Sequence, residues 1–187
     1  MSSWPQRPVA YAQRLDTRAE DAINLVVMHC TELPDLATAR RYAERIHYPA
    51  SASGNCGHFY VDRDGAIEQW VPLTRVAHHV RGFNLHSVGI ELVNSGRYPD
   101  WLDSRRQLMT EPYPEAQIQA LVELLEHLRG RLPGLRYIAG HEELDLEKVP
   151  ASDQPACLVH RKRDPGPLFP WSQVLSMVAL DRYDASV

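Results

Sequence analysis

Short apolar runs that alternate with helical patterns constrain the fold of this chain most strongly. The run INLVVMH at 23–29 is rich in β-branched residues, which is typical of a buried strand. Further strands are predicted at 87–93 and 135–140. Between them, apolar residues at helical spacing form one stripe and predict a strong helix from Pro114. Strands and helices in this order predict an α/β fold with a single mixed β-sheet flanked by helices.

The segment GHFYVDRDGAIEQWV at 57–71 predicts a β-hairpin whose loop length follows from side-chain pairing. A two-residue turn would pair Val61 with Glu68, which is a poor match of faces. A three-residue loop ending at Gly65 pairs Val61 with Ile67 instead. We therefore expect a type I turn followed by Gly65 in the left-handed conformation.

The remaining segments are read from their periodicity and their prolines. Apolar residues at helical spacing predict a helix over 36–46, and a closing helix is expected over 171–180. The segment 94–113 is long and irregular, and loops of that length usually serve a function or carry small elements of their own. Residues 141–170 are expected to be mostly loop.

Composition limits the classes of protein to consider. The 187 residues fit one domain, and a net charge of −4 gives no general argument for nucleic acid or a membrane surface. No apolar run could span a bilayer and no export signal is visible, so we expect no transmembrane segment and a cytoplasmic location. A mature periplasmic form would look the same. The three cysteines exclude a full disulfide framework, because their number is odd.

Two of the nine histidines directly follow predicted strands, where sites collect in open sheets. His29 follows VVM, and His141 follows YIAG. Two imidazoles brought together there could bind a metal ion. The alternative is an ordinary hydrogen-bonded histidine at each strand end. Spacing alone favours the alternative, because the two residues are far apart and no compact metal motif surrounds them.

Asp164 is a candidate third ligand of a catalytic zinc site. It precedes Pro165, so its backbone is expected to be extended, and side chains two residues apart then share a face. Lys162 would point the same way as Asp164, and the two could act as metal ligand and oxyanion stabiliser. The alternative is a surface ion pair in a basic loop, which is common.

Glu91 is a charged residue within the apolar strand sequence GIELV. It lies either on a solvated face or at a buried functional position, and alternation along the strand does not decide between the two. Its apolar neighbours make partial burial plausible. Burial would raise its pKa towards that of a useful general base.

The cysteines offer competing interpretations. Cys56 lies two residues before His58, and Cys157 lies three residues before His160. Neither pair has a second pair at finger-like spacing, so a structural zinc site is a weak hypothesis. Cys30 adjoins a histidine, which leaves nucleophilic cysteine catalysis open without specific support.

Six segments occur in an order that matches one family. They are VVMHCT (26–31), GHFYVDRDG (57–65), AHHVRGFNLHSVGIEL (77–92), PYPEAQIQAL (112–121), IAGHEELD (138–145) and RKRDPGPLFPW (161–171). Together they resemble the zinc-dependent N-acetylmuramoyl-L-alanine amidases of the AmpD/AmiD type, which are related to phage amidases and peptidoglycan recognition proteins. The resemblance covers nearly the whole chain and implies the fold of those proteins.

The resemblance also implies roles by position. His29, His141 and Asp164 match the three zinc ligands of the family. Glu91 matches the acid usually assigned as general base, and Lys162 matches the lysine that faces the reacting carbonyl. The implied cofactor is therefore Zn²⁺.

Other positions match or depart from the family pattern. His79 and Asn84 match residues that line the substrate cleft. Gly57 stands where some relatives carry a tyrosine, and His78 replaces a tryptophan. An insertion at 142–160 replaces a short connection between two predicted ligands, and it could form a flap over the cleft or bring Cys157 or His160 near the metal.

The implied organisation is an N-terminal extension at 1–22, an amidase domain at 23–181 and a tail at 182–187. The implied reaction is hydrolysis of the amide bond between N-acetylmuramic acid and L-alanine, with peptidoglycan fragments as partners. The main alternative is a module that binds muropeptides without cutting them. A cysteine-dependent amide hydrolase that uses Cys30 is a third hypothesis.

Overall fold

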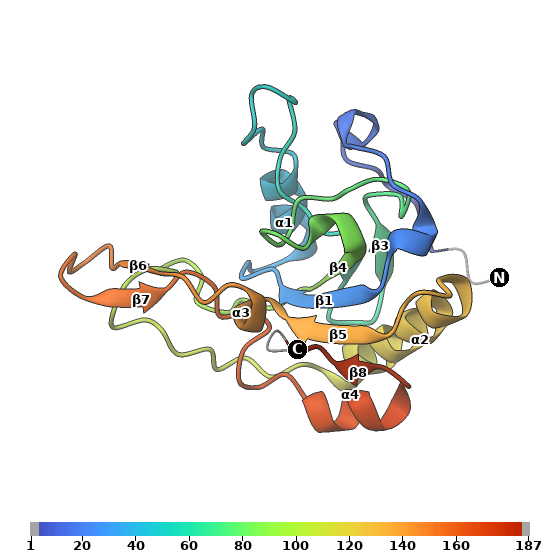
Figure 1. Ribbon diagram of the computed structural model, residues 1–187. Coiled ribbons are helices and arrows are strands. Elements are labelled where there is room, and N and C mark those ends of the chain that lie inside the picture. The colour runs from blue at the N-terminus through green and yellow to red at the C-terminus, as the bar shows by residue number, and fades with distance from the viewer. Residues whose placement is uncertain (1–3, 185–187) are drawn as a thin grey trace.

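The computed structural model describes residues 4–184, in which the main sheet has six strands (Figure 1). The strand order is β3–β2–β4–β1–β5–β8, and only the pair β2–β3 is antiparallel. The strands are β1 Leu25–Cys30, β2 Phe59–Val61, β3 Ile67–Gln69, β4 Ser87–Leu92, β5 Tyr137–Gly140 and β8 Asp181–Arg182. The predicted mixed sheet is confirmed.

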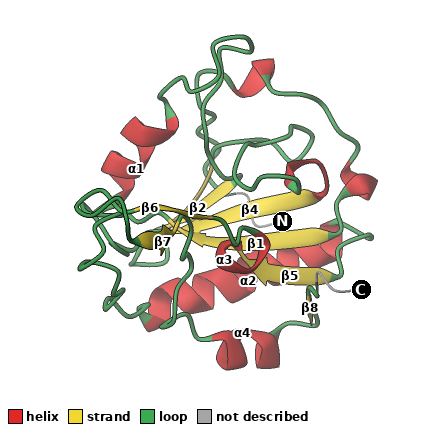
Figure 2. Cartoon of the chain, turned by 60° about the vertical axis from the view of Figure 1, so that its left-hand side comes forward, coloured by secondary structure: helices red, strands yellow, loops and turns green. Residues whose placement is uncertain are grey.

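Helices cover both faces of this sheet, as Figures 1 and 2 show. The α-helices are α1 Leu36–Ala43, α2 Glu115–Arg131, α3 His141–Leu144 and α4 Trp171–Met177. Three short 3-10 helices lie at Ala12–Arg14, Glu20–Ala22 and Asn84–His86. In Figure 1, α2 and α4 lie on one side of the sheet and α1 lies on the other.

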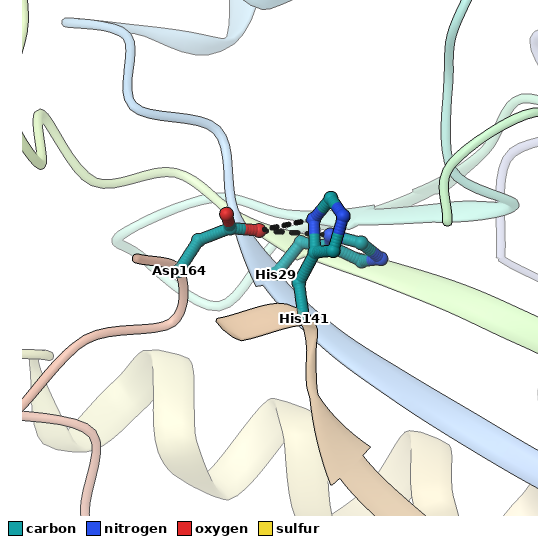
Figure 3. Close-up of side chains that lie close together, drawn as sticks. All are labelled: His29, His141 and Asp164. Carbon is teal, nitrogen blue, oxygen red and sulfur yellow. Dashed lines mark hydrogen bonds and ion pairs between the residues drawn. The ribbon is translucent and has the colours of Figure 1, made fainter. Parts of the chain in front are cut away.

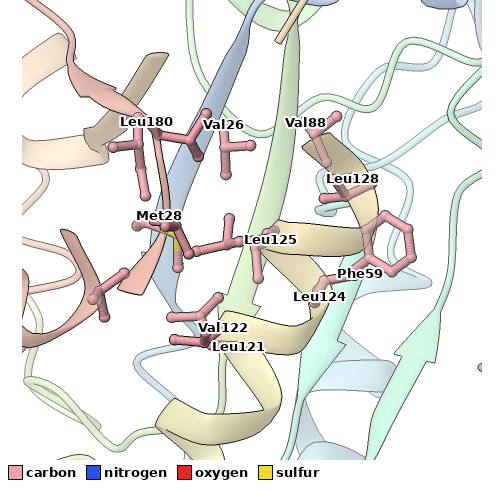
Figure 4. Packing of buried hydrophobic residues seen from close by; sticks show 14 of the residues in the cluster. Val26, Met28, Phe59, Val88, Leu121, Val122, Leu124, Leu125, Leu128 and Leu180 are labelled. Atoms are coloured by element: carbon pink, nitrogen blue, oxygen red, sulfur yellow. The ribbon is translucent and has the colours of Figure 1, made fainter. Parts of the chain in front are cut away.

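The central strand β1 is buried on both faces, which explains its nearly continuous apolar sequence. Val26 and Met28 belong to the core under α2, whereas Leu25 and Val27 belong to a smaller cluster on the other face. The helix α2 contributes the apolar stripe that its sequence predicts, and Figure 4 shows this stripe against the strands. Burying each such leucine stabilises the fold by about 1.5–3 kcal/mol.

A polar residue on α2 makes a contact that the apolar stripe does not reveal. Gln117 is fully buried, and its side-chain amide donates to the carbonyl oxygens of Val61 and Val93, both at 3.0 Å. These carbonyls lie at the ends of β2 and β4. The amide therefore ties the ends of the two strands together, and at Val61 it adds to the hydrogen bond that the same carbonyl accepts from Val93 N–H at 2.9 Å.

The hairpin of β2 and β3 has the predicted register. Val61 lies opposite Ile67, and Gly65 has a φ of 88°. The N-terminal residues cover the edge of this hairpin, because Arg7 N–H donates to the Gln69 carbonyl at 2.8 Å. Tyr11 is buried in the second core cluster. The division proposed at residue 22 stays a prediction, and part of the proposed tail lies outside the described residues.

Several element ends differ from those predicted. The first helix ends at Ala43, and Ile46 is 50% exposed, so it adds no core contact that would extend the helix. The segment 141–170 also contains a two-stranded antiparallel sheet, formed by β6 Lys148–Pro150 and β7 Leu158–His160. The helix expected to reach residue 180 ends at Met177, and β8 follows it. Across residues 4–184, the helices are too short or too polar to cross a bilayer.

Candidate metal centre

Three predicted ligands meet at one edge of the sheet. His29 lies near the end of β1, and His141 directly follows the neighbouring parallel strand β5. Asp164 comes from the segment before α4. Its Oδ2 atom is 2.9 Å from His29 Nδ1 and 3.0 Å from His141 Nδ1 (Figure 3). All three side chains are buried, and one ligand atom from each lies within 4.8 Å of the others.

The backbone around Asp164 is held on both sides. Its carbonyl oxygen accepts from the N–H of Glu142 at 2.9 Å, beside His141. The carbonyl oxygen of Pro165 accepts from the hydroxyl of Tyr113 at 2.6 Å, and the Asp164–Pro165 peptide is cis. These bonds place the carboxylate between the two imidazoles.

The second nitrogen of His29 takes part in a hydrogen-bond chain. The Ser87 hydroxyl donates to the Phe83 carbonyl at 2.8 Å, so its oxygen accepts from His79 Nε2 at 3.2 Å. His79 Nδ1 then accepts from His29 Nε2 at 3.0 Å. This tautomer leaves His29 Nδ1 with a lone pair that faces a carboxylate oxygen of Asp164. A cation between the two acceptors would resolve this conflict.

Other features of the cluster fit a metal ion. Asp164 Oδ1 and His141 Nε2 are buried, and neither has a hydrogen-bond partner among the described residues. Burial and then the neighbouring His141 lower the pKa of His29 to about 4, so its imidazole is neutral at pH 7. Burial opposes the ionisation of Asp164, but the neighbouring His141 and its hydrogen bond hold the pKa of this carboxyl group well below the usual value. Two imidazoles, of which that of His29 is neutral, and one carboxylate form a ligand set that suits catalytic zinc.

Glu91 is the direct neighbour of His29 across the parallel pair β1–β4. Its side chain is partly buried, and burial followed by the charge of Asp164 raises its pKa to about 8. Gly57 makes room for it, because a Cβ atom at Gly57 would lie 2.8 Å from Glu91 Cγ. The structure therefore shows Glu91 as a partly buried acid that lines the cleft.

Lys162 lines the same cleft as the histidine–aspartate cluster. Its positive charge lowers the pKa values of Glu91 and Asp164, after the larger effects of burial on both carboxyl groups. The cleft has a volume of about 640 Å³. It therefore brings together a ligand cluster, an acid and an ammonium group.

His79 and Asn84 also line the cleft. The Asn84 Oδ1 atom accepts from the backbone N–H groups of His79 at 3.0 Å and Val80 at 2.8 Å, so this side chain holds the loop in place. Both ring nitrogens of His79 have partners. Substrate contact by His79 or Asn84 stays a prediction.

The insertion at 142–160 contacts segments that line the cleft, and a role for it as a flap stays a prediction. Ser152 N–H donates to the Leu102 carbonyl at 2.8 Å, and Ser104 donates to Asp153. Neither Cys157 nor His160 belongs to the cluster or to the lining of the cleft. The insertion therefore packs against the segment 94–113, and none of residues 142–160 lines the cleft.

The other cysteines are poor candidates for a nucleophile. Cys30 and Cys56 lie along the cleft but are almost fully buried. Burial raises the pKa of Cys30 well above the usual value, and it raises the pKa of Cys56 to about 12. Both thiols are protonated at neutral pH, whereas a cysteine nucleophile needs thiolate.

Sequence reasoning missed two charged residues in the wall of the cleft. Glu32 and Arg97 form a buried ion pair, with Arg97 Nε 2.7 Å from Glu32 Oε1. The only signal for Arg97 was the long irregular segment 94–113, which marked a region and no particular residue. Glu32 follows His29 by three residues, and nothing in its spacing indicates a partner.

Comparisons with known proteins agree with this site. Residues 19–167 match the family described as N-acetylmuramoyl-L-alanine amidase. The chain is 31% identical over 147 residues to the 1,6-anhydro-N-acetylmuramyl-L-alanine amidase AmpD of Enterobacter cloacae, which covers 73% of this chain and 62% of that protein. The chain thus spans less than two thirds of this relative.

Solved structures share the fold. The N-acetylmuramoyl-L-alanine amidase LysC from Clostridium intestinale superposes with a TM-score of 0.67 at 20% identity, covering 96% of this chain and 99% of that one. The amidase AmiD from E. coli, in complex with the substrate anhydro-N-acetylmuramic acid-L-Ala-D-gamma-Glu-L-Lys, superposes with a TM-score of 0.63 at 25% identity. That match covers 88% of this chain and 61% of AmiD. The predicted amidase-like fold is confirmed.

Proposed function

Since the chain belongs to the N-acetylmuramoyl-L-alanine amidase family, we propose that it hydrolyses the amide bond between N-acetylmuramic acid and L-alanine in peptidoglycan or its fragments. The observation that supports this most is the meeting of His29, His141 and Asp164 beside Glu91 and Lys162 in one cleft. Each group has a task in amide hydrolysis.

The ligand cluster would hold Zn²⁺ through His29, His141 and Asp164. When bound, zinc would polarise the amide carbonyl and lower the pKa of a water molecule to about 7. The chain's own contribution is a neutral imidazole at His29, which burial favours, and an ionised carboxylate at Asp164, which the neighbouring His141 favours.

Glu91 would act as the general base and then as the general acid. Its pKa near 8 is close to neutral pH, where a carboxyl group exchanges protons most effectively. It would accept a proton from the attacking water and deliver it to the leaving amine of L-alanine. Lys162 would stabilise the negative charge that develops on the carbonyl oxygen.

A digest of defined muropeptides, analysed by mass spectrometry, tests the proposal. We expect free stem peptide that begins at L-alanine, and we expect chelator or Asp164→Ala to abolish it. Release of disaccharide, or cleavage within the stem peptide, would contradict the proposed bond. The same digest compares substrates with and without an anhydro-muramyl end.

The competing hypothesis is a module that binds muropeptides without cutting them. The three ligand positions, Glu91 and Lys162 are all present, which favours the enzyme. One zinc ion per purified chain, lost in Asp164→Ala, would support hydrolysis. Muropeptide binding without zinc and without product would support the binding module.

A further inference from the structure

One buried guanidinium joins the segments that carry the candidate catalytic groups. Arg97 is 3% exposed, and all five of its side-chain N–H groups have acceptors. Two of them bind the carboxylate of Glu32, at 2.7 and 2.8 Å. The others bind the Gln107 side chain at 3.1 Å and the carbonyl oxygens of His160 at 2.9 Å and Arg161 at 3.3 Å.

The partner carboxylate is itself fixed in space. Glu32 lies three residues after His29 and has a φ of 48°, in the left-handed region that non-glycine residues seldom adopt. Its carbonyl oxygen accepts from the indole N–H of Trp101 at 3.0 Å. Gly96 approaches so closely that a Cβ there would lie 2.6 Å from Glu32 Cγ. The Glu32–Arg97 ion pair therefore connects the segment after β1 to the segment after β4 in a fixed geometry.

The hydrogen bonds from Arg97 to the carbonyl oxygens of His160 and Arg161 connect the same ion pair to the segment that carries Asp164. His160 and Arg161 directly precede Lys162, and Asp164 follows two residues later. The five N–H groups of Arg97 are all used by Glu32, Gln107 and the two carbonyls, so Arg97 holds the ligand segment through its backbone, and its charge also interacts with that of Asp164. A guanidinium can serve the carboxylate and both carbonyls together because its five donors form a fixed fork.

We propose that Arg97 is a positioning residue, which holds the segment carrying Lys162 and Asp164 in register with the segment carrying His29. The catalytic part of this inference rests on the proposed amidase function, whereas the metal-binding part does not. Without the Arg97 guanidinium, the Asp164 carboxylate and the Lys162 ammonium group would no longer be held at a fixed distance from the two imidazoles.

The test compares Arg97→Lys with Arg63→Lys. Lysine keeps the charge but has only three donors on one nitrogen, so it cannot reproduce the contacts of Arg97. Arg63 is a matched control in the same region, because it binds Glu111 at 2.6 Å and the Pro34 carbonyl at 2.8 Å. Its hydrogen bonds do not reach residues 160–161.

Two readouts separate positioning from general stability. In Arg97→Lys we expect the zinc dissociation constant, measured by chelator competition, to rise about 10–100-fold. We also expect kcat for the muramoyl–L-alanine bond to fall by a factor on the order of 10², with KM little changed, because misplaced catalytic groups slow the chemical step. Arg63→Lys should match the wild type in zinc affinity and kcat, even where its melting temperature falls.

Equal zinc affinity and kcat in Arg97→Lys and the wild type would overturn the proposal, as would equal losses in both variants. If Arg97→Lys does not fold, Glu32→Gln replaces it, since this change keeps the shape but weakens the hold on the guanidinium. It should shift both readouts in the same direction, and unchanged values would overturn the proposal. A wild type that binds zinc but leaves the muramoyl–L-alanine bond intact would instead refute the proposed function, and the zinc comparison would still decide the role of Arg97.

Discussion

At the scale of single residues, two carboxyl groups near His29 behave in opposite ways. Asp164 has two imidazole neighbours and stays ionised, whereas Glu91 is partly buried, and burial followed by the charge of Asp164 raises its pKa to about 8. Environments that separate the pKa values of two acids also separate their roles. Asp164 is suited to hold a cation, and Glu91 is suited to move a proton.

Lys162→Ala tests the proposed oxyanion partner. The lysine is not one of the predicted ligands, so zinc should remain bound at one ion per chain. Loss of one oxyanion stabiliser typically lowers kcat by about 10²–10³. Steady-state kinetics on a muropeptide, together with metal analysis, would measure both effects. Full activity in this variant would exclude the assigned role.

Glu91→Gln tests the raised pKa through folding stability. The folded pKa of about 8 lies above the usual glutamate value of 4.5, so between these values the folded state keeps a proton that the unfolded state has lost. The free energy of unfolding therefore falls as pH rises through this window. We expect the free energy of unfolding of the wild type, measured with chelator present, to fall by a few kcal/mol between about pH 5 and about pH 8. Glu91→Gln should not show this decrease, because glutamine does not titrate.

Urea unfolding at several pH values would show this difference, and subtraction cancels the titration of groups common to both proteins. Parallel stability profiles for wild type and Glu91→Gln would mean that the carboxyl group is not held protonated.

The sequence was sufficient to propose the metal ligands but not the hydrogen bonds that hold their side chains in place. His29 and His141 stand out because each follows an apolar strand, and Asp164 because it precedes a proline. The chain from His29 through His79 to Ser87 depends on which ring nitrogens face each other, and only tertiary structure determines that. The substrate-lining role of His79 was predicted only because its position matches the family pattern. In the structure, its ring nitrogens instead bind His29, a predicted metal ligand, and the Ser87 hydroxyl.

At the scale of elements, the site depends on close approach between strands. Gly57, just before β2, lies against Glu91 of β4 with no room for a side chain. The hairpin that follows was predictable in register, because pairing Val61 with Ile67 keeps apolar residues on one face. The two-residue strand β8 and the pair β6–β7 were not predictable, because strands this short have no alternation to read.

Two glycine substitutions should have opposite effects. Gly57→Ala would force the new Cβ against Glu91 Cγ and the Gly89 carbonyl oxygen, which lie 2.8 and 3.1 Å away. We expect a loss of about 1–3 kcal/mol in the free energy of unfolding and a lower kcat. Gly130→Ala in α2 meets nothing within 4 Å and should stabilise the protein by about 0.5–1 kcal/mol.

Thermal unfolding and kinetics of both variants would provide the measurement, with Gly130→Ala as the control for activity. A Gly57→Ala protein with the stability and kcat of wild type would show that Glu91 moves aside freely.

At the scale of the whole molecule, the sheet order brings together ligands from three distant parts of the chain. His29 and Asp164 are 135 residues apart in sequence. The unfolded chain has no such cluster, so a metal ion that binds it stabilises the folded state. Composition predicted a single domain of this class, but the meeting of the ligands depends on the complete strand order.

Zinc should therefore raise the melting temperature. A free zinc concentration about 100-fold above the dissociation constant adds about 2.7 kcal/mol to the free energy of unfolding. For a chain of this size, that corresponds to a rise of about 5–10 °C. Calorimetry with zinc and with chelator would measure the shift, which Asp164→Ala should abolish. Equal melting temperatures in zinc and in chelator would argue against a metal centre.

Asp164 and Lys162 follow both histidines of the cluster in the order of synthesis. While the ribosome is still adding residues after β5, the emerging chain already carries both histidines but lacks the carboxylate and the ammonium group. It can form most of the sheet in that interval, yet it has no complete centre with which to capture a metal ion or cut a substrate. With the proposed ligand set, a metal centre can form only after residue 164 has joined the two histidines that precede it in the chain.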